Sequence, residues 1–324
     1  QPTLTDVVKY HGGIGSALQM LPTLANVCGM AAVRLLPVVS ATPSPLLAKR
    51  DRRMLAGVIA VDLVSGVFLT SGLLIVGGGT FVVLYSSCTM WTAGLRWWLT
   101  GKRLSRTQLT AVGLLCVGLG LNALSVHGHG SHDHDVHHDT GLPPDTTPHV
   151  VYLLGCGVAL AGSVLHSLMF VLSETFLEAT RMHPWALCGT LGTVEAGVLG
   201  AWNVFLLLAT PAAADYDLSV AMHGGSLHWA AAGLLGLVAC SAAHAASFFF
   251  MLKAVGSVTA AVFKGTQMVS VWLISAVFFC GYQETQCWTP ESALSVIVVC
   301  AAMGLYASAR PPVGGEGAAG GPPV

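Results

Sequence analysis

Long apolar runs separated by short polar connections constrain the possible folds of this chain more than any other feature. The hydrocarbon core of a bilayer is about 30 Å thick, and a helix needs about 20 apolar residues to cross it. Nine such windows are visible, at 15–39, 54–76, 80–99, 109–126, 150–177, 185–210, 227–252, 258–279 and 292–307. Composition agrees, because 54% of the residues are hydrophobic and 9% are charged, whereas about a quarter are charged in soluble domains. The pattern predicts an all-α, polytopic membrane protein.

The overall charge and the positions of the cysteines indicate which molecules the chain is expected to bind. The formal net charge is −1, which gives no reason to expect a nucleic acid partner. The nine cysteines lie almost entirely in apolar stretches without paired spacing such as Cys-x-x-Cys, so we expect small residues of the lipid phase or the core. The expected partners are the lipid bilayer and a small-molecule substrate, and a homodimer stays open.

Lysine and arginine mark alternate connections between the windows, and such residues favour the cytosolic side. They occur at 49–53, Lys102, Arg103, Arg106, Arg181, Lys253 and Arg310. The intervening connections, at 77–79, 127–149, 211–226 and 280–291, contain almost none. We therefore expect cytosolic termini and a lumenal histidine-rich loop, in an endomembrane of the Golgi, lysosome or vacuole type.

A weak internal repeat divides the chain. Residues 76–84 align without gaps with residues 255–263 and are identical at four positions, and 120–123 correspond to 304–307. Because many transporters consist of two repeated halves, we predict a five-plus-five inverted-repeat bundle of ten helices, with the first helix upstream of Gln1. The predicted parts are a first half (1–126), a histidine-rich linker (127–149), a second half (150–309) and a disordered Gly/Pro-rich tail (310–324).

Short motifs along the chain resemble the drug/metabolite transporter superfamily. They include Gly-Lys-Arg-Leu at 101–104, Ser-x-x-Gln-Leu at 105–109 and a glycine-rich span that ends in Gly-Leu-Gly-Leu-Asn at 118–122. Ser-Glu-Thr-Phe-Leu at 173–177 and Glu-Ala-Gly at 195–197 also fit. Within the superfamily, the chain looks like the solute carrier 35 nucleotide-sugar-transporter-like branch and its chloroquine-resistance-transporter-like relatives. The resemblance implies the inverted-repeat fold and secondary transport, without a named substrate.

Ionisable residues inside the apolar windows are the candidate substrate-binding groups. Each costs about 2.5–3.5 kcal/mol on insertion scales, so such groups usually face a cavity or a partner. Asp62 and Glu195 lie mid-window, where a substrate- or proton-linked role competes with polar contacts between helices. Lys264 and Gln267 share one helix face, suited to an anionic substrate or to structural pairing. His244 is either a packing residue or a proton relay.

Two further features favour structural roles. Glu174, two helical turns beyond His166, is expected to be an interface carboxylate near Arg181. Small residues recur every four positions from Gly192 to Gly200, which predicts a stripe for close helix packing. Such packing would also shield a neighbouring glutamate from lipid.

Six histidines crowd the connection between the two predicted halves, at His127, His129, His132, His134, His137 and His138. Imidazoles interspersed with carboxylates suit zinc, but a Gly/Ser-rich loop provides no rigid second shell. We expect loosely held zinc, and a metal role, an acidity sensor and an incidental linker all stay open. The windows contain no His-x-x-x-Asp or His-Glu-x-x-His motif for zinc transfer or zinc catalysis.

The sequence favours a secondary transporter, rather than an enzyme, for a small organic metabolite such as a nucleotide-sugar, an amino acid or a drug-like solute. A divalent-metal transporter or buffer that uses the histidine-rich loop is one alternative. A membrane adaptor that transports nothing is another.

Overall fold

The chain is an all-α membrane protein over the residues that the structure describes. The computed structural model describes residues 21–37, 39, 48–102, 104–129, 148–209, 227–264, 270, 273 and 290–309. Within these ranges four helical segments are long and apolar enough to cross a bilayer: Lys49–Val76, Val150–Thr180, Pro184–Ala209 and His228–Val255. Within the predicted windows, every described residue is helical except Leu36 and Ser87.

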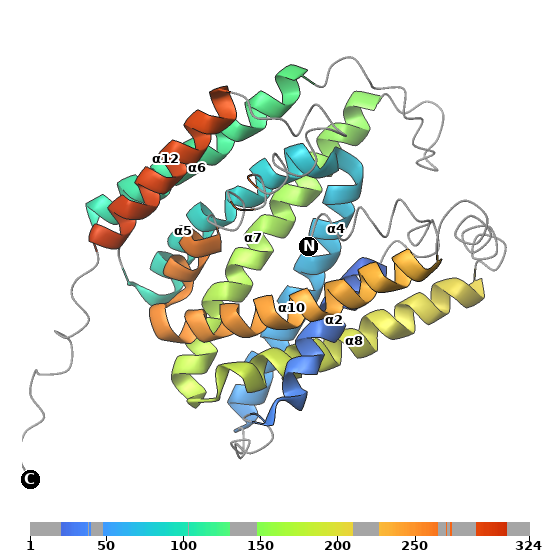
Figure 1. Ribbon diagram of the computed structural model, residues 1–324. Helices are drawn as coiled ribbons and strands as arrows, with labels where there is room; N and C mark the ends of the chain where they lie inside the picture. Colours follow the sequence, from blue (N-terminus) through green and yellow to red (C-terminus); the bar gives the residue numbers. More distant parts are fainter. Residues whose placement is uncertain are drawn as a thin grey trace, which may run out of the picture. The chain divides into compact units, whose positions relative to one another are not determined.

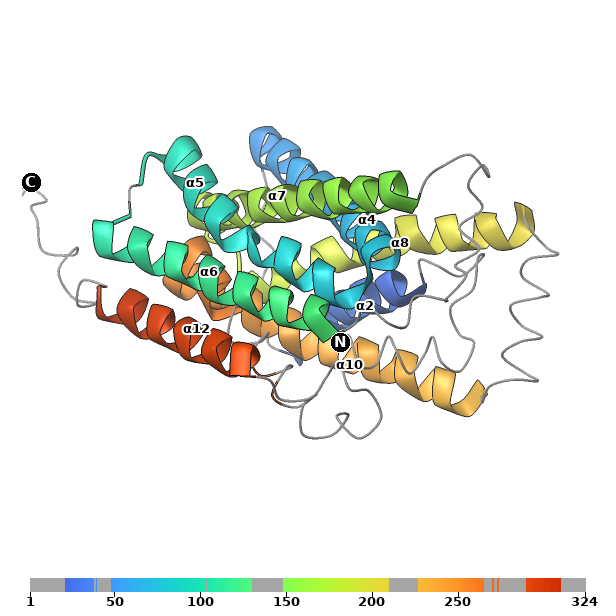
Figure 2. The ribbon, with the colours of Figure 1, turned by 90° about the horizontal axis from the view of Figure 1, so that it is seen from above.

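The described helices are drawn in Figures 1 and 2, and the third predicted window, 80–99, is divided at Ser87 between α4 and α5. Their bounds are α2 Leu21–Ala32, η1 Val33–Leu35, α4 Lys49–Ser86, α5 Cys88–Thr100, α6 Arg106–His129, α7 Pro148–Thr180, α8 Pro184–Ala209, α10 Leu227–Val255 and α12 Pro290–Ser308. After η1, Leu36 is extended (ψ 134°), as expected for a residue before proline. This explains why the first window does not continue as one helix to its predicted end.

The predicted loop at 77–79 is a bend inside α4 rather than a break. Ser65 and Tyr85 both contact His166, although 20 residues would separate them by about 30 Å in a straight helix. The helix therefore reverses direction between them, as Figure 1 shows at the end of α4. The helical state persists through Gly77–Gly79 because backbone groups in an apolar phase must stay hydrogen-bonded. Glycine is a common site of such bends.

The chain divides into two compact units. Unit 1 contains residues 1–92 and 141–260, and unit 2 contains residues 93–140 and 261–324. Each unit combines segments from both predicted repeat halves. The boundaries of the predicted halves stay a prediction.

In unit 2, α6 and α12 pack side by side (Figures 1 and 2). Leu115 and Leu119 of α6 meet Val299 of α12 in a small core, and the Ser295 hydroxyl donates to the Gly118 carbonyl at 2.6 Å. The start of α6 is fixed by a capping box. Ser105 and Gln108 exchange two hydrogen bonds, each 3.1 Å long. The Ser-x-x-Gln motif therefore has a local structural function.

In unit 1, the short helix α2 contacts both α8 and α10. Small residues allow the contacts: a Cβ added to Gly29 of α2 would lie 2.4 Å from the Val238 carbonyl oxygen of α10. The Ser241 hydroxyl of α10 donates to the Asn26 carbonyl of α2 at 2.8 Å. Backbone-to-backbone contact of this kind drives helix association where no hydrophobic effect operates.

Candidate functional site

An antiparallel seam between α4 and α7 positions the candidate site in unit 1. Small residues of α7 lie against α4, because an added Cβ at Gly155 would fall 2.4 Å from Ile75 and one at Gly162 would fall 3.0 Å from Leu69. Gly72 of α4 faces Ala159 of α7 in the same way. The contacting residues recur every three or four positions on both helices and run in opposite chain directions. This is the spacing of residues that share one helix face.

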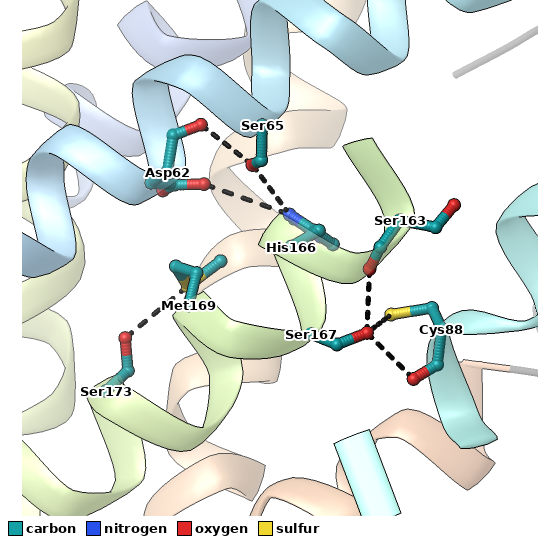
Figure 3. A network of polar contacts seen from close by, with 8 residues as sticks. All are labelled: Asp62, Ser65, Cys88, Ser163, His166, Ser167, Met169 and Ser173. Atoms are coloured by element: carbon teal, nitrogen blue, oxygen red, sulfur yellow. Dashed lines mark hydrogen bonds and ion pairs between the residues drawn. The ribbon is translucent and has the colours of Figure 1, made fainter. Parts of the chain in front are cut away.

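The same register brings His166 of α7 against Asp62 and Ser65 of α4 (Figure 3). The His166 Nδ1 atom lies 3.9 Å from Asp62 Oδ1 and 3.4 Å from Ser65 Oγ. The Ser65 hydroxyl also donates to the Asp62 backbone carbonyl at 2.8 Å. Ser65 is fully buried and Asp62 is 9% exposed, so the cluster lies in a low-dielectric interior where such contacts are strong.

Glu195 joins this cluster from α8. Its side chain is 2% exposed and lies within electrostatic range of Asp62. One turn earlier, Gly192 brings α8 against α2, where an added Cβ would lie 2.3 Å from the Ala31 nitrogen. The Glu195 Oε1 atom is buried and has no hydrogen-bond partner among the described residues. A buried acceptor without a partner is costly, and it marks a place where a ligand or a proton is expected to bind.

A row of aromatic rings connects the two intramembrane histidines. The His166 ring packs edge-on against Phe170 with centroids 4.5 Å apart, and Phe170 lies 4.5 Å from Phe248 of α10. His244 stacks near Phe248 at 6.5 Å, and Tyr85 covers His166 from the second limb of α4 at 5.8 Å. His244 is therefore linked to the cluster through ring packing, and both of its predicted roles stay predictions.

All three ionisable groups of the cluster lie at similar depth along their helices. Asp62, His166 and Glu195 each lie near the middle of a candidate span, and the spans contain 28, 31 and 26 residues respectively. In transporters built from repeated halves, substrate and coupling-ion sites occur near the bilayer midplane. The positions of the three groups fit such a site.

The other predicted site residues belong to unit 2 or lie outside the described residues. Lys264 is half-buried and belongs to unit 2, whereas Asp62 and Glu195 belong to unit 1. Gln267 lies outside the described residues, as do four of the loop histidines: His132, His134, His137 and His138. His127 and His129 form the last turn of α6, beyond the predicted end of its window. Among the described residues, no group of three or more His, Cys, Asp or Glu is placed to hold a metal ion.

The sequence did not single out three neighbours of the cluster. Ser65 and Tyr85 contact His166, and Cys188 of α8 is fully buried within electrostatic range of Asp62 and Glu195. The spacing from Asp62 to Ser65 along one helix face is visible in the sequence. The position of Tyr85 is not, because it depends on the bend in α4.

The expected packing stripe on α8 is displaced. Close contacts with the segment around α2 occur at Gly189, next to Arg34, and at Gly192, whereas an added Cβ at Gly200 would meet nothing within 4 Å. Among the described residues the predicted stripe therefore makes close contact at Gly192 and not at Gly200.

Glu174 is a buried acceptor, and its predicted position at the membrane interface near Arg181 stays a prediction. It is 4% exposed and accepts hydrogen bonds from both the backbone N–H, at 3.0 Å, and the hydroxyl of Ser257. Gly256, with φ 82°, ends α10 in the left-handed conformation that glycine adopts without strain. Glu174 thereby caps the helical segment that begins at Ser257.

The turn between α7 and α8 carries a second set of polar contacts. The Lys253 ammonium donates to the Met182 carbonyl at 2.9 Å, and the Trp185 indole donates to the Ala246 carbonyl at 3.0 Å. Burial, and then the positive charge of Lys253, lower the pKa of His183 below its usual value. This turn therefore favours an uncharged His183.

Comparisons with known proteins support the fold alone. No family model matches the chain, and the search of curated proteins found no match. A solved structure described only as "Crystal structure of protein" is similar over 94% of this chain and 92% of that chain, with a TM-score of 0.59 and 14% sequence identity. At that identity the likeness says nothing about substrate or mechanism.

Proposed function

We propose that the chain is a secondary transporter that moves a small organic metabolite across a membrane by alternating access. The observation that carries the proposal is the cluster of Asp62, His166 and Glu195 at mid-depth in three apolar helices. Intramembrane ionisable groups are costly and usually mark a substrate or ion pathway. A purely structural role would be served equally well by uncharged side chains.

The pairing of helices supports the proposed inverted repeat of ten helices. In that repeat, α2 corresponds to α8 and α6 corresponds to α12. Each of these corresponding pairs packs together within its own unit, as expected for elements next to a pseudo-two-fold axis. The proposal includes cytosolic termini, an endomembrane location and the predicted substrate contacts Lys264 and Gln267.

A ligand screen followed by reconstitution tests the proposal. The purified protein is screened by thermal shift against UDP-glucose, GDP-mannose, L-glutamine, L-lysine, a dipeptide and zinc chloride, because a bound ligand raises the Tm. Each stabilising solute is then tested for uptake into proteoliposomes. We expect uptake by the wild-type protein and its loss in Glu195→Ala and Lys264→Ala.

A matched control distinguishes the effect of losing a residue of the candidate site from the effect of losing any negative charge. Glu178→Ala removes an exposed carboxylate of α7 and should leave uptake unchanged. Deletion of residues 127–139 should also preserve uptake of an organic solute. If that deletion alone abolishes transport, the metal hypothesis replaces this one. If no solute enters proteoliposomes, a non-transporting adaptor is favoured.

A further inference from the structure

Two buried oxygen atoms, one on α2 and one on α8, accept no hydrogen bond from the described residues. They are Asn26 Oδ1 and Glu195 Oε1, and the whole Glu195 side chain is 2% exposed. A buried acceptor without a donor is costly. Such atoms are expected to receive a donor from a bound molecule.

The two helices that carry these oxygens pack against each other in opposite chain directions within unit 1. An added Cβ at Gly189 of α8 would lie 2.8 Å from the Arg34 Cβ of η1, and one at Gly192 would lie 2.5 Å from the Met30 Cβ of α2. Three residues forward along α8 therefore match four residues back toward the start of α2.

This register places Asn26 and Glu195 at nearly the same depth. Asn26 precedes Met30 by four residues, and Glu195 follows Gly192 by three, so each lies on the contacting face of its helix. With the rise of an α-helix, the two residues differ in depth by about 1.5 Å. The two orphan oxygens therefore belong to one site at the contact between α2 and α8.

The neighbouring hydroxyl groups and the neighbouring arginine do not supply the missing donor. The Ser241 hydroxyl of α10 donates to the Asn26 backbone carbonyl at 2.8 Å, and the Thr193 hydroxyl donates to a carbonyl of its own helix at 2.6 Å. Each hydroxyl has one proton to donate. Arg34 is exposed, and its Cβ packs about 9 Å along α8 from Glu195.

We infer that this site binds a primary ammonium group and that the substrate is an amine or an amino acid, an inference that rests on the proposed transport function. An ammonium carries three N–H donors and no acceptor, so one such group can donate to both Asn26 Oδ1 and Glu195 Oε1. Hydrogen bonds from a charged donor are about twice as strong as neutral ones. Asp62 lies within electrostatic range of Glu195, which adds to the attraction for a cation.

The two oxygens distinguish an ammonium from other ligands. The phosphates of a nucleotide-sugar would bring negative charge toward a buried carboxyl group, which is unfavourable. A metal cation needs a shell of several oxygen ligands, and the part of the chain that the structure describes contains no group of three or more His, Cys, Asp or Glu placed to hold one. A water molecule can donate to both oxygens but brings no positive charge.

Thermal shift of the purified full-length protein tests the ammonium site without transport. The probes are n-butylammonium chloride, butyltrimethylammonium chloride, sodium butyrate and sodium chloride, at an ionic strength kept equal with potassium chloride. Butyltrimethylammonium has the same charge and no N–H donor, so we expect n-butylammonium alone to raise the Tm. Equal stabilisation by both organic cations, stabilisation by sodium chloride, or no stabilisation by n-butylammonium overturns the inference.

Two variants and a matched control locate the bound probe. Glu195→Gln removes the negative charge and Asn26→Leu removes the amide oxygen, so each should weaken n-butylammonium binding by about tenfold or more. Asn203→Leu removes another amide with a buried, unpartnered Oδ1 atom, about 12 Å along α8 from Glu195, and should leave binding unchanged. Equal weakening by Asn203→Leu and Asn26→Leu overturns the inference. If a variant fails to fold, the comparison of probes on the wild-type protein decides.

Uptake into proteoliposomes separates the substrate class from the transport function. L-Glutamine is compared with N-acetyl-L-glutamine, which lacks the ammonium group. Uptake of L-glutamine or L-lysine that n-butylammonium inhibits, without uptake of the acetylated compound, supports the inference. Uptake of a nucleotide-sugar without binding of n-butylammonium overturns the inference while transport stands. Binding of n-butylammonium without uptake of any solute of the ligand screen upholds the ammonium site and contradicts the transport function.

Discussion

Substitution of Gly72 by alanine tests whether backbone contact between α4 and α7 holds the candidate site together. The added methyl group would lie 2.7 Å from the Ala159 Cβ, 2.8 Å from its Cα and 2.9 Å from its nitrogen, whereas carbon atoms prefer separations of about 3.5–4.0 Å. Two of these three atoms belong to the backbone, which cannot rotate away. The helices must therefore separate, which weakens the contact between Asp62 and His166 farther along the seam.

The expected magnitude follows from two opposing effects. Alanine favours a helix over glycine by about 1 kcal/mol, and overpacking a tight interface costs about 1–3 kcal/mol. Gly57 in the same helix provides the matched control, because an added Cβ there would meet nothing within 4 Å. Both variants gain the same helix propensity, so the difference between their free energies of unfolding gives the cost of the tight packing at Gly72. Gly72→Ala should be less stable than Gly57→Ala by about 1–3 kcal/mol.

Thermal unfolding in detergent, followed by tryptophan fluorescence, measures the difference. The chain contains eight tryptophans, and for domains of about 150–250 residues each kcal/mol shifts the Tm by about 2–4 °C. Gly72→Ala should therefore melt several degrees below Gly57→Ala. If Gly72→Ala melts at the same temperature as the control or above it, close backbone packing does not hold α4 against α7.

Three further perturbations have defined outcomes. Ser257→Ala removes one hydrogen bond to the buried Glu174 carboxylate and should lower stability by about 1.5–3 kcal/mol, measured by thermal unfolding. Burial and the positive charge of Lys253 lower the pKa of His183, so the unfolded chain binds a proton there more readily. Stability should therefore fall as pH drops below about 6.5, and His183→Gln should reduce that fall in a pH series of Tm values. Deletion of residues 127–139 should abolish most zinc binding in calorimetry and leave the Tm unchanged.

Each of these perturbations has a matched comparison. Ser247→Ala removes an exposed hydroxyl that donates to the Ala243 carbonyl of its own helix, and it should change the Tm little. His228→Gln replaces an exposed histidine of α10 and controls for the chemical change of the substitution. Replacement of residues 127–139 by a Gly/Ser segment of equal length controls for the shortened connection. Equal effects of a variant and its control would contradict the corresponding explanation.

Apolar length and spacing made the helices predictable, whereas the site also depends on how separate helices meet. Asp62 and Glu195 stand out in the sequence because charge is rare in apolar windows, but their proximity depends on how α4 and α8 pack, which no local pattern shows. The contact of His166 with Asp62 follows from the register of small residues around Ala159. No local sequence pattern predicts that register, because glycine and alanine are common throughout the chain.

The side chain of Tyr85 shows a second limit of prediction from the sequence. Its contact with His166 requires α4 to reverse direction, and the glycines at 77–79 predict a turn there. They do not predict that the helix continues through the turn, because glycine weakens a helix in water. In an apolar medium the backbone has no water to bond, so the helical hydrogen bonds persist.

The buried thiols give the protein a built-in reporter of motion. Cys188 is fully enclosed, with its sulfur 4.0 Å from the Met30 carbonyl of α2, whereas Cys240 and Cys300 are exposed. A maleimide should therefore alkylate Cys188 only when α2 separates from α8, at a rate set by how often that happens. The native chain thus records the opening of the helices around Glu195 in the time course of one alkylation reaction, without an engineered label.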